Sequence, residues 1–402
     1  MNFIKSIVLF IAFQGIQSSF AQSGCTDPAA TNFNPGATIN DGSCTYPVTH
    51  KSPVLRGAMN PIITESSGLV LTDGKLWTHN DSGNPAEIYS IDTTDGHTLQ
   101  TVVIDNYPNV DWEDITADSN YIYIGDHGNN SSDRTDLKVL KIAKTDIGSA
   151  ATVHVNAQAI SFRYTDQTVF GSGGTNNYDC EALISIKDSL YIFTKDRGDL
   201  KTRVYKMPKT PGTYALDPYT SYNVNGLITG ADYNAHTHEI VLIGYFSGHS
   251  NSFLWYLSNY QGDMFFSGNK RRIEIGNGLE WQTEGVCWLS DNRVFISCET
   301  TDPIPASLFV SDINFNTTQV KAGNIQPESS IYPNPANDRI FVDNLDCYNN
   351  YFVTDLNGRK LLEGSLEQGD QFVGVTILVP GTYILNINGA EGNNKHLLFE
   401  KR

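Results

Sequence analysis

Residues 113–130, EDITADSNYIYIGDHGNN, carry the pattern that decides the fold of the middle of this chain. An acidic residue and a short apolar run come first, a polar turn follows, and a second apolar run ends in Asp126. Short apolar runs rich in β-branched and aromatic residues and bounded by turn residues are typical of β-strands. The stretch therefore predicts two antiparallel strands joined by a tight turn.

The same pattern recurs along the middle of the chain. The first runs begin 46, 68, 49 and 54 residues apart, at Ser67, Glu113, Glu181, Gly230 and Glu284. Sets of about four short strands at this spacing are typical of propeller blades. We therefore predict an all-β fold with a five- or six-bladed β-propeller over residues 50–325. A sixth blade would lie in the 68-residue interval, where residues 152–164 are alternatively one long outer strand.

Acidic residues recur at corresponding ends of these strands. Because adjacent strands are antiparallel, the start of the first strand and the end of the second lie at the same face of a blade. The acids are Glu65, Glu113, Glu181 and Glu284 at the starts, and Asp81, Asp126, Asp196 and Glu299 at the ends. We expect them to converge on one mouth of the central channel, close to His79 and His127.

Crowded carboxylates repel one another, and a bound cation relieves that repulsion. Oxygen ligands without Cys favour Ca²⁺, with Mg²⁺ or Mn²⁺ as alternatives. The predicted metal ligands are Glu113, Glu181, Glu284, Asp81, Asp126, Asp196 and Glu299. In a catalytic site the metal would activate water, with His79 or His127 as acid or base. The competing interpretation is structural, since an acid repeated in each blade can cap backbone N–H groups and brace its neighbours.

The N-terminus predicts export. Residues 1–21 have the features of a secretory signal peptide, with Lys5, an apolar run and a small-residue cleavage site ending at Ala21. No other window approaches the roughly 18 uninterrupted apolar residues of a membrane span, so the mature chain should have no transmembrane segment. Cys25 leaves a lipoprotein alternative open, although Gln22 stands where such sites have Leu.

Residues 23–47 predict a small module closed by a Cys25–Cys44 disulfide, because so short a segment cannot bury a core. They resemble a short module of surface proteins from bacteria that use the type IX secretion route, and are similar to calcium-binding thrombospondin type 3 repeats. Candidate ligands of a second Ca²⁺ are Asp27, Asn32, Asn34 and Asp41. Alternatively these side chains only form turns. The spacing leaves the states of four cysteines open: Cys180, Cys287, Cys298 and Cys347.

The segment 327–402 carries four motifs in order. They are Tyr332-Pro333-Asn334-Pro335-Ala336, Asp355-Leu356-Asn357-Gly358-Arg359, Gly381-Thr382-Tyr383 and Lys401-Arg402. Proline stiffens the start and Asn-Gly favours a hairpin turn, so we predict a small antiparallel, Ig-like β-sandwich. Together the motifs resemble the type A sorting domain of type IX secretion. The resemblance implies recognition by the outer-membrane translocon through a motif that includes Pro333, Asn334, Pro335, Gly358 and Gly381, and a secreted or cell-surface location.

The function of the middle segment is less defined. Its blade rhythm and acidic strand ends resemble six-bladed propellers of the gluconolactonase and phytase-like type. A net charge of −17 argues against binding to nucleic acid. We expect a propeller that binds an extracellular ligand, with Ca²⁺ in or near its channel. The alternative is a metal-dependent hydrolase of a lactone, phosphoester or small ester, so whether the chain is an enzyme stays open.

Overall fold

The computed structural model describes residues 21–171, 175–246, 250–276, 281–301, 304–313, 331–342, 349–356, 358–366, 372–388 and 394–402. The chain divides into two compact units, Met1–Asn316 and Thr317–Arg402. Within the described ranges, no helix is long and apolar enough to cross a membrane. The predicted signal peptide, apart from Ala21, and Cys347 lie outside these ranges, so both stay predictions.

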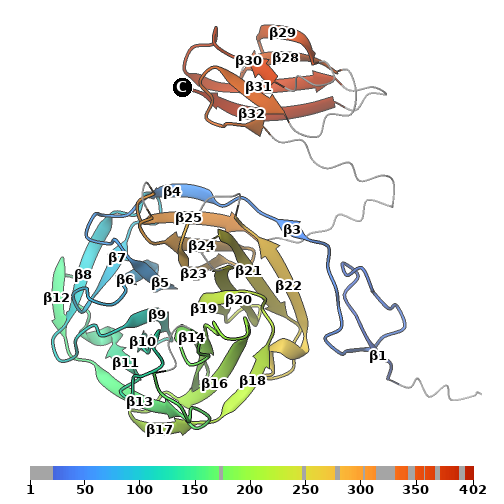
Figure 1. Cartoon of the computed structure of the whole chain (residues 1–402). Helices are drawn as coiled ribbons and strands as arrows, with labels where there is room; N and C mark the ends of the chain where they lie inside the picture. Colours follow the sequence, from blue (N-terminus) through green and yellow to red (C-terminus); the bar gives the residue numbers. More distant parts are fainter. Residues whose placement is uncertain are drawn as a thin grey trace, which may run out of the picture. The chain divides into compact units, whose positions relative to one another are not determined.

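The first unit is a β-propeller, in which five sheets of the described chain are arranged around a common axis (Figure 1). Blade 1 consists of β5 (Ser66–Thr72), β6 (Lys75–Asn80), β7 (Glu87–Ile91), β8 (Thr98–Ile104) and β12 (Thr152–Val155). Blade 2 consists of β9 (Trp112–Ala117), β10 (Tyr121–Asp126), β11 (Lys138–Ala143), β13 (Gln158–Tyr164) and β17 (Gly212–Leu216). Blade 3 consists of β14 (Cys180–Ile186), β15 (Ser189–Thr194), β16 (Thr202–Pro208) and β18 (Pro218–Tyr222).

The remaining two blades include strands from the start of the chain. Blade 4 consists of β19 (Leu227–Asn234), β20 (Glu239–Phe246), β21 (Ser250–Ser258), β22 (Asn269–Glu274) and β3 (Thr49–His50). Blade 5 consists of β23 (Thr283–Ser290), β24 (Arg293–Cys298), β25 (Ser307–Asp312) and β4 (Val54–Ala58). Because β4 precedes blade 1 in sequence but pairs with β25, it joins the two ends of the propeller and closes the ring.

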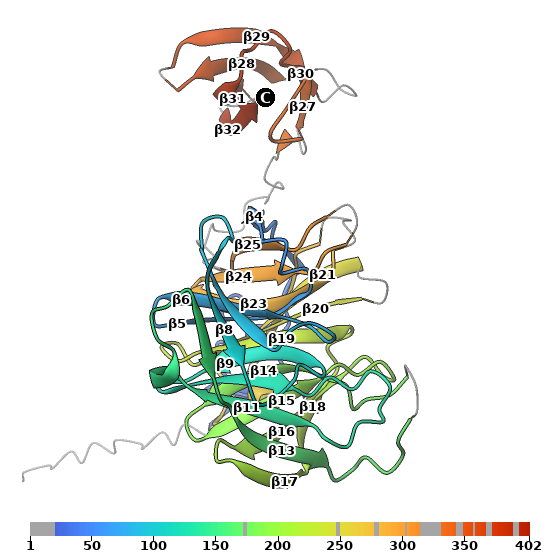
Figure 2. The same cartoon turned by 90° about the vertical axis from the view of Figure 1, so that its left-hand side faces the viewer.

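The 68-residue interval contains exchanged edge strands, and the described residues hold no sixth blade. β12 pairs in parallel with β8 of blade 1, whereas β13 is an outer strand of blade 2. β17, which follows the third strand of blade 3, returns to pair in parallel with β13, beside which it lies in both views (Figure 1 and Figure 2). The prediction of an all-β propeller is thus confirmed, with five blades among the described residues.

Apolar side chains fill the interfaces between neighbouring blades. Each of five buried clusters joins two adjacent blades, including the pair formed by blades 5 and 1. Burial of this kind is the main stabilising contribution in a folded chain. Cys287 and Cys298 belong to different clusters, on opposite faces of blade 5, and both are free thiols, as is Cys180.

The small N-terminal module contains β1 (Ser23–Gly24) and β2 (Ile39–Asn40) and is closed by the predicted Cys25–Cys44 disulfide. It contacts the edge of blade 4. Asn40 donates a hydrogen bond to Asn269 over 2.8 Å, and the Lys270 ammonium donates one to the Gly42 carbonyl over 2.9 Å. The module is therefore attached to the propeller by side-chain contacts as well as by the chain itself.

The second unit contains two antiparallel sheets. One holds β26 (Ile331–Tyr332), β27 (Arg339–Val342) and β30 (Phe372–Gly374). The other holds β28 (Asn349–Asp355), β29 (Lys360–Leu366), β31 (Gly381–Asn388) and β32 (Asn394–Lys401). The first and last motifs lie side by side, because Asn334 accepts a hydrogen bond from the Glu400 N–H over 2.9 Å. Gly358 has φ 81°, a conformation that suits glycine in the turn before β29.

Candidate metal centre at the mouth of the propeller

Each innermost strand contains a β-bulge near its start. Pairing with the second strand shifts register immediately after Ser66, Trp112, Cys180, Ile228 and Thr283. A bulge re-aims the side chain of the extra residue. The residues at the five bulges are Ser67, Glu113, Glu181, Thr229 and Glu284. The two hydroxyls donate to main-chain carbonyls of neighbouring inner strands, Ser67 to Glu113 over 2.6 Å and Thr229 to Thr283 over 2.8 Å.

A second set of acidic residues lies two positions before the bulges. Its members are Glu65, Asp111 and Asp179, with Leu227 and Gln282 at the corresponding places in blades 4 and 5. In blades 1, 3 and 5 the first residue after the second strand donates a main-chain hydrogen bond to the carbonyl of the residue at this position. Asp81 N–H donates to Glu65 over 2.9 Å, Lys195 N–H to Asp179 over 2.8 Å, and Glu299 N–H to Gln282 over 2.9 Å. These bonds hold Asp81, Lys195 and Glu299 beside the acids of the inner strands.

Asp81, Asp111 and Glu113 form what we call the three-acid cluster. One carboxylate oxygen of each lies within 4.8 Å of the others. Glu113 is only 3% exposed, and no hydrogen bond to its carboxylate is found in the described part of the chain. No lysine or arginine of the described residues forms an ion pair with any of the three acids. The cluster is therefore a concentration of negative charge without a protein cation bound directly to it.

Gly128 packs directly against this cluster. The Gly128 N–H donates a hydrogen bond to the Asp111 carbonyl over 3.1 Å, just as the Asp81 N–H donates one to the Glu65 carbonyl in blade 1. A Cβ atom at this position would lie 2.0 Å from Glu113 Oε1 and 2.5 Å from Asp111 Oδ2. Any other residue would therefore have to displace the two carboxylates.

A neighbouring group of acids is neutralised by the protein itself. Glu113, Asp179 and Glu181 also bring one oxygen each within 4.8 Å of the others. Here, however, the buried Lys195 ammonium lies 2.9 Å from Glu181, and Arg197 pairs with Asp179. The two groups of acids, which we call the two halves of the mouth, thus differ. Lys195 and Arg197 neutralise Glu181 and Asp179, whereas no lysine or arginine of the described residues is paired with the three-acid cluster.

Burial and mutual repulsion raise the pKa values of six carboxyl groups at the mouth. Burial, then the charges of Glu181 and Asp81, hold the pKa of Glu113 well above its ordinary value. Burial, then the charges of Glu284 and Glu65, raise the pKa of Asp81 to about 6, and burial, then the charge of Asp81, raises that of Asp111 to about 6. Burial raises the pKa of Glu181 and Glu284 to about 7, and that of Glu299 to about 9. A bound cation would favour the ionised forms and reverse these shifts.

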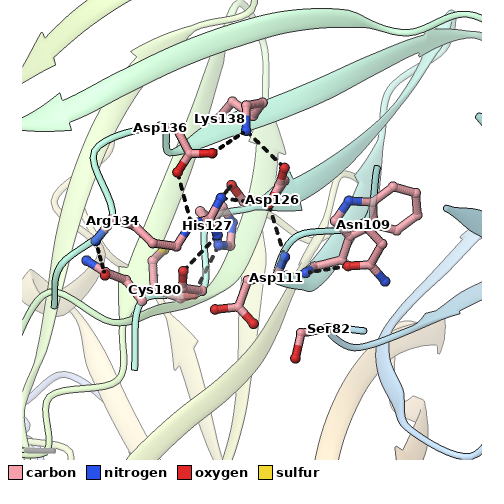
Figure 3. Close-up of polar contacts among 12 residues, drawn as sticks. Ser82, Asn109, Asp111, Asp126, His127, Arg134, Asp136, Lys138 and Cys180 are labelled. Carbon is pink, nitrogen blue, oxygen red and sulfur yellow. Dashed lines mark hydrogen bonds and ion pairs between the residues drawn. The ribbon is translucent and has the colours of Figure 1, made fainter. Parts of the chain in front are cut away.

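Five of the seven predicted metal ligands lie outside the three-acid cluster: Glu181, Glu284, Glu299, Asp126 and Asp196. Of these, Asp126 and Asp196 are held in ion pairs of their own. Asp126 is ion-paired with Arg134 over 2.9 Å and with Lys138 over 3.1 Å, as Figure 3 shows. Asp196 is paired with Arg203. Asp126 is still inside β10, opposite Trp112, and Asp196 comes one position after Lys195. Asp81 and Glu299 reach the mouth because each is the first residue after its second strand, and neither Asp126 nor Asp196 has that position.

The two histidines considered as acid or base are inside the protein. His79 and His127 are both 0% exposed. Their Nδ1 atoms lie 3.1 Å from the Asn80 carbonyl and 3.0 Å from the Cys180 carbonyl. Burial lowers their pKa to about 4 and about 3, so both rings are neutral at physiological pH. Neither ring is exposed to a molecule in the mouth.

The Asx side chains of the N-terminal module bond mainly within the module, although Asp27 also accepts a hydrogen bond from Asn269 of blade 4 over 3.3 Å. Asp27, Asn34 and Asp41 accept hydrogen bonds from N–H groups two residues onward, as in Asx turns. Asn32 donates to the Ser43 carbonyl over 2.7 Å and accepts from the Thr45 N–H over 2.8 Å. These contacts are what the turn interpretation expects.

Sequence reasoning missed Asp111, Asp179 and Gly128 as residues of the mouth. A signal for the acids was present, because an acid two positions before the bulge glutamate occurs at both 111–113 and 179–181. The repeat places Ser67 opposite Glu113, but the list of acids groups Glu65 with Glu113; the structure makes Ser67 the counterpart of Glu113 and Glu65 that of Asp111. Gly128 has no comparable signal, since its role depends on the local backbone path.

Comparison with known protein families concerns the second unit. Residues 330–399 match the family described as "Secretion system C-terminal sorting domain". The C-terminal segment is a type IX sorting domain. It implies export to the cell surface or the medium and an interaction with the type IX machinery. No curated protein sequence matches the chain.

Solved structures similar to this chain include propeller enzymes. An exo-β-1,3-galactanase from Phanerochaete chrysosporium is 11% identical with a TM-score of 0.46, covering 87% of this chain and 99% of its own. An aldose sugar dehydrogenase from Streptomyces coelicolor, in its PQQ-bound form, is 11% identical with a TM-score of 0.39, covering 66% and 99%. A GH43_1 enzyme from Xanthomonas citri is 12% identical with a TM-score of 0.37, covering 66% and 90%. We draw no functional argument from these similarities.

Proposed function

We propose that the protein is an exported β-propeller that binds Ca²⁺ at the three-acid cluster and uses the ion to hold an extracellular ligand at the mouth. The observation that carries this proposal is the difference between the two halves of the mouth. Lys195 and Arg197 compensate Asp179 and Glu181, whereas no lysine or arginine of the described chain pairs with Asp81, Asp111 or Glu113. Burying an uncompensated carboxylate is costly, and a cation removes that cost.

The donor set favours calcium over transition metals. All three side chains offer carboxylate oxygens, and the buried imidazoles of His79 and His127 are bonded through Nδ1 to main-chain carbonyls. Hard oxygen donors with room for additional ligands suit Ca²⁺, which takes six to eight oxygens. The partial exposure of Asp81 and Asp111 leaves positions for water or ligand oxygens.

One observation favours the alternative, a metal-dependent hydrolase of a lactone, phosphoester or small ester. Asp81 and Asp111 are partly exposed, so a substrate at the mouth can reach their carboxylates. In such an enzyme one of these carboxyl groups, rather than His79 or His127, would act as the base. Turnover of an ester or phosphoester panel that is abolished by EDTA would select this alternative over ligand binding.

Calorimetric titration of the full chain with CaCl₂ tests the proposal. We expect saturable binding that Glu113→Gln weakens by more than about tenfold, because affinity depends on the number of charged ligands. The matched control is Asp92→Asn, in the exposed Asp92–Asp95–His97 group, which also has metal-like spacing. Calcium binding that Asp92→Asn abolishes and Glu113→Gln leaves unchanged would place the ion elsewhere and reject the proposal.

A further inference from the structure

One side chain bridges blades 1 and 2 beside the three-acid cluster. Residues 105–111 cross from β8 of blade 1 to β9 of blade 2, and Asn109 lies within this crossing. The Asn109 Nδ2 donates a hydrogen bond to the Asp81 carbonyl over 2.7 Å and another to the Asn80 carbonyl over 3.0 Å. The Asn109 Oδ1 accepts one from the Trp112 N–H over 3.2 Å. The end of the second strand of blade 1 is thereby tied to the start of the inner strand of blade 2.

The amide of asparagine matches this set of partners. It carries two N–H donors on one atom and an acceptor on the other, and the groups that it meets are two main-chain carbonyls and one main-chain N–H. An aspartate at position 109 would have no donor for either carbonyl, and a leucine of similar size would have neither donor nor acceptor. The bridge therefore depends on the chemistry of Asn109 as well as on its size.

The bridge bears on the spacing of the three acids. Asp111 and Glu113 belong to one stretch of blade 2, where the Asp111 N–H donates to Asp126 Oδ1 over 3.2 Å. Asp81 belongs to blade 1, so its distance from the other two acids depends on how the two blades are held together. Asn109 binds the main chain of Asp81 itself and precedes Asp111 by two residues. It therefore fixes carboxylates from two blades relative to one another.

We infer that Asn109 is a positioning residue that makes the three-acid cluster selective for Ca²⁺ over Mg²⁺. The inference rests on the proposed calcium site. Ca²⁺ takes six to eight oxygens and gains from all three carboxylates, whereas Mg²⁺ keeps several waters and is held by one or two carboxylates. Asp111 and Glu113 supply two carboxylates from blade 2 alone. Loss of the bridge, which displaces Asp81, therefore weakens Ca²⁺ binding more than Mg²⁺ binding.

Calorimetric titration of the full chain with CaCl₂, and separately with MgCl₂, tests the inference. Asn109→Ala should weaken calcium binding by about tenfold, because it removes the hydrogen bonds between the blades. Magnesium binding should weaken by less than about threefold, since that ion does not need the third carboxylate. The ratio of the two dissociation constants should therefore change in favour of magnesium.

A second variant separates the bridge from the local turn. In Asn109→Ser the hydroxyl can still accept the bond from the Trp112 N–H, but the side chain is too short to span to the carbonyls of blade 1. It should show the same loss of calcium selectivity as Asn109→Ala. The matched control is Asn106→Ala. Asn106, in the same crossing, donates to and accepts from the Ala157 main chain over 2.9 Å each, in the connection between β12 and β13. Its loss should leave both affinities unchanged.

A double-mutant cycle shows whether Asn109 acts through Asp81. In an Asp81→Asn background, Asn109→Ala should weaken calcium binding by less than about twofold more, because the carboxylate that it positions is already absent. Melting temperatures in EDTA show whether each variant is folded, and Asn109→Ser tests the bridge even if Asn109→Ala is unstable.

The inference is rejected if Asn109→Ser binds calcium as the wild type does, if calcium and magnesium binding weaken by the same factor, or if the effects of Asn109→Ala and Asp81→Asn are additive. Calcium binding that Glu113→Gln weakens and both Asn109 variants preserve would reject this inference alone and leave the calcium proposal standing. A wild-type protein that binds no calcium would reject both.

Discussion

Raising the pH should destabilise the cation-free protein, and calcium should reverse that loss. In the folded protein the pKa of Glu181 and Glu284 is about 7, against an ordinary value of 4.5. Between these two pH values the folded state holds more protons than the unfolded state. The free energy of unfolding therefore decreases as the pH rises through this window.

The size of the effect follows from the same shifts. A rise of about 2.5 pKa units in one buried glutamate corresponds to about 3 kcal/mol. For a protein of this size, a loss of that magnitude lowers the melting temperature by roughly 6–12 °C. Calcium at about 100 times its dissociation constant should restore about 2.7 kcal/mol. Its effect should be smaller at pH 5, where protons compete for the carboxylates.

The assay is differential scanning calorimetry at pH 5 and pH 7.5, with EDTA or with CaCl₂. Glu113→Gln is the informative variant, because it should remove the calcium-dependent part of the stabilisation. Asp232 is a useful internal comparison, since burial raises its pKa to about 7 at a place away from the mouth. Asp232→Asn should therefore reduce the pH dependence without changing the response to calcium. A melting temperature in EDTA that rises from pH 5 to pH 7.5, or an equal calcium response in wild type and Glu113→Gln, would refute the reasoning.

Three further predictions concern Gly128, Lys195 and the C-terminal sorting domain. Gly128→Ala should keep the fold but lower calcium affinity in calorimetry, because its Cβ would lie 2.0 Å from Glu113 Oε1; unchanged affinity would contradict the placement of the ion. Lys195→Met should lower the free energy of unfolding by about 3–5 kcal/mol in urea titration, since it leaves Glu181 buried without its partner, and adding Glu181→Gln should recover part of the loss. Deleting residues 330–402 should leave the protein inside the cell envelope, as judged by fractionation and immunoblotting, whereas normal appearance at the surface or in the medium would contradict a sorting role.

The blades were predictable because each repeats a local pattern. The apolar runs that start near Glu113, Glu181 and Glu284 are the inner strands β9, β14 and β23. Local apolar periodicity determines which segments become strands, and tight turns determine which strands are neighbours. The C-terminal domain was predictable for a similar reason, since its motifs lie at turns and strand ends.

Features that depend on distant parts of the chain were not predictable. The pairing of β4 with β25, and the return of β17 to β13, join segments far apart in sequence and have no local signal. The bulges had a comparable effect at the mouth. Because each inner strand has one extra residue at its bulge, Ser67 occupies the position of Glu113, and Glu65 occupies that of Asp111. After β10 the chain takes a different path: His127 turns into the core, and Gly128 lies beside Asp111. Spacing alone therefore identified the acidic mouth but not which acids share a site.

The most direct test of the central claim is a crystal structure of the protein grown in CaCl₂, with anomalous scattering recorded at long wavelength. We predict an anomalous peak beside Gly128, roughly 2.3–2.6 Å from carboxylate oxygens of Asp81, Asp111 and Glu113. A well-ordered mouth without such a peak at saturating calcium, or a peak only at the exposed Asp92–Asp95–His97 group, would contradict the account.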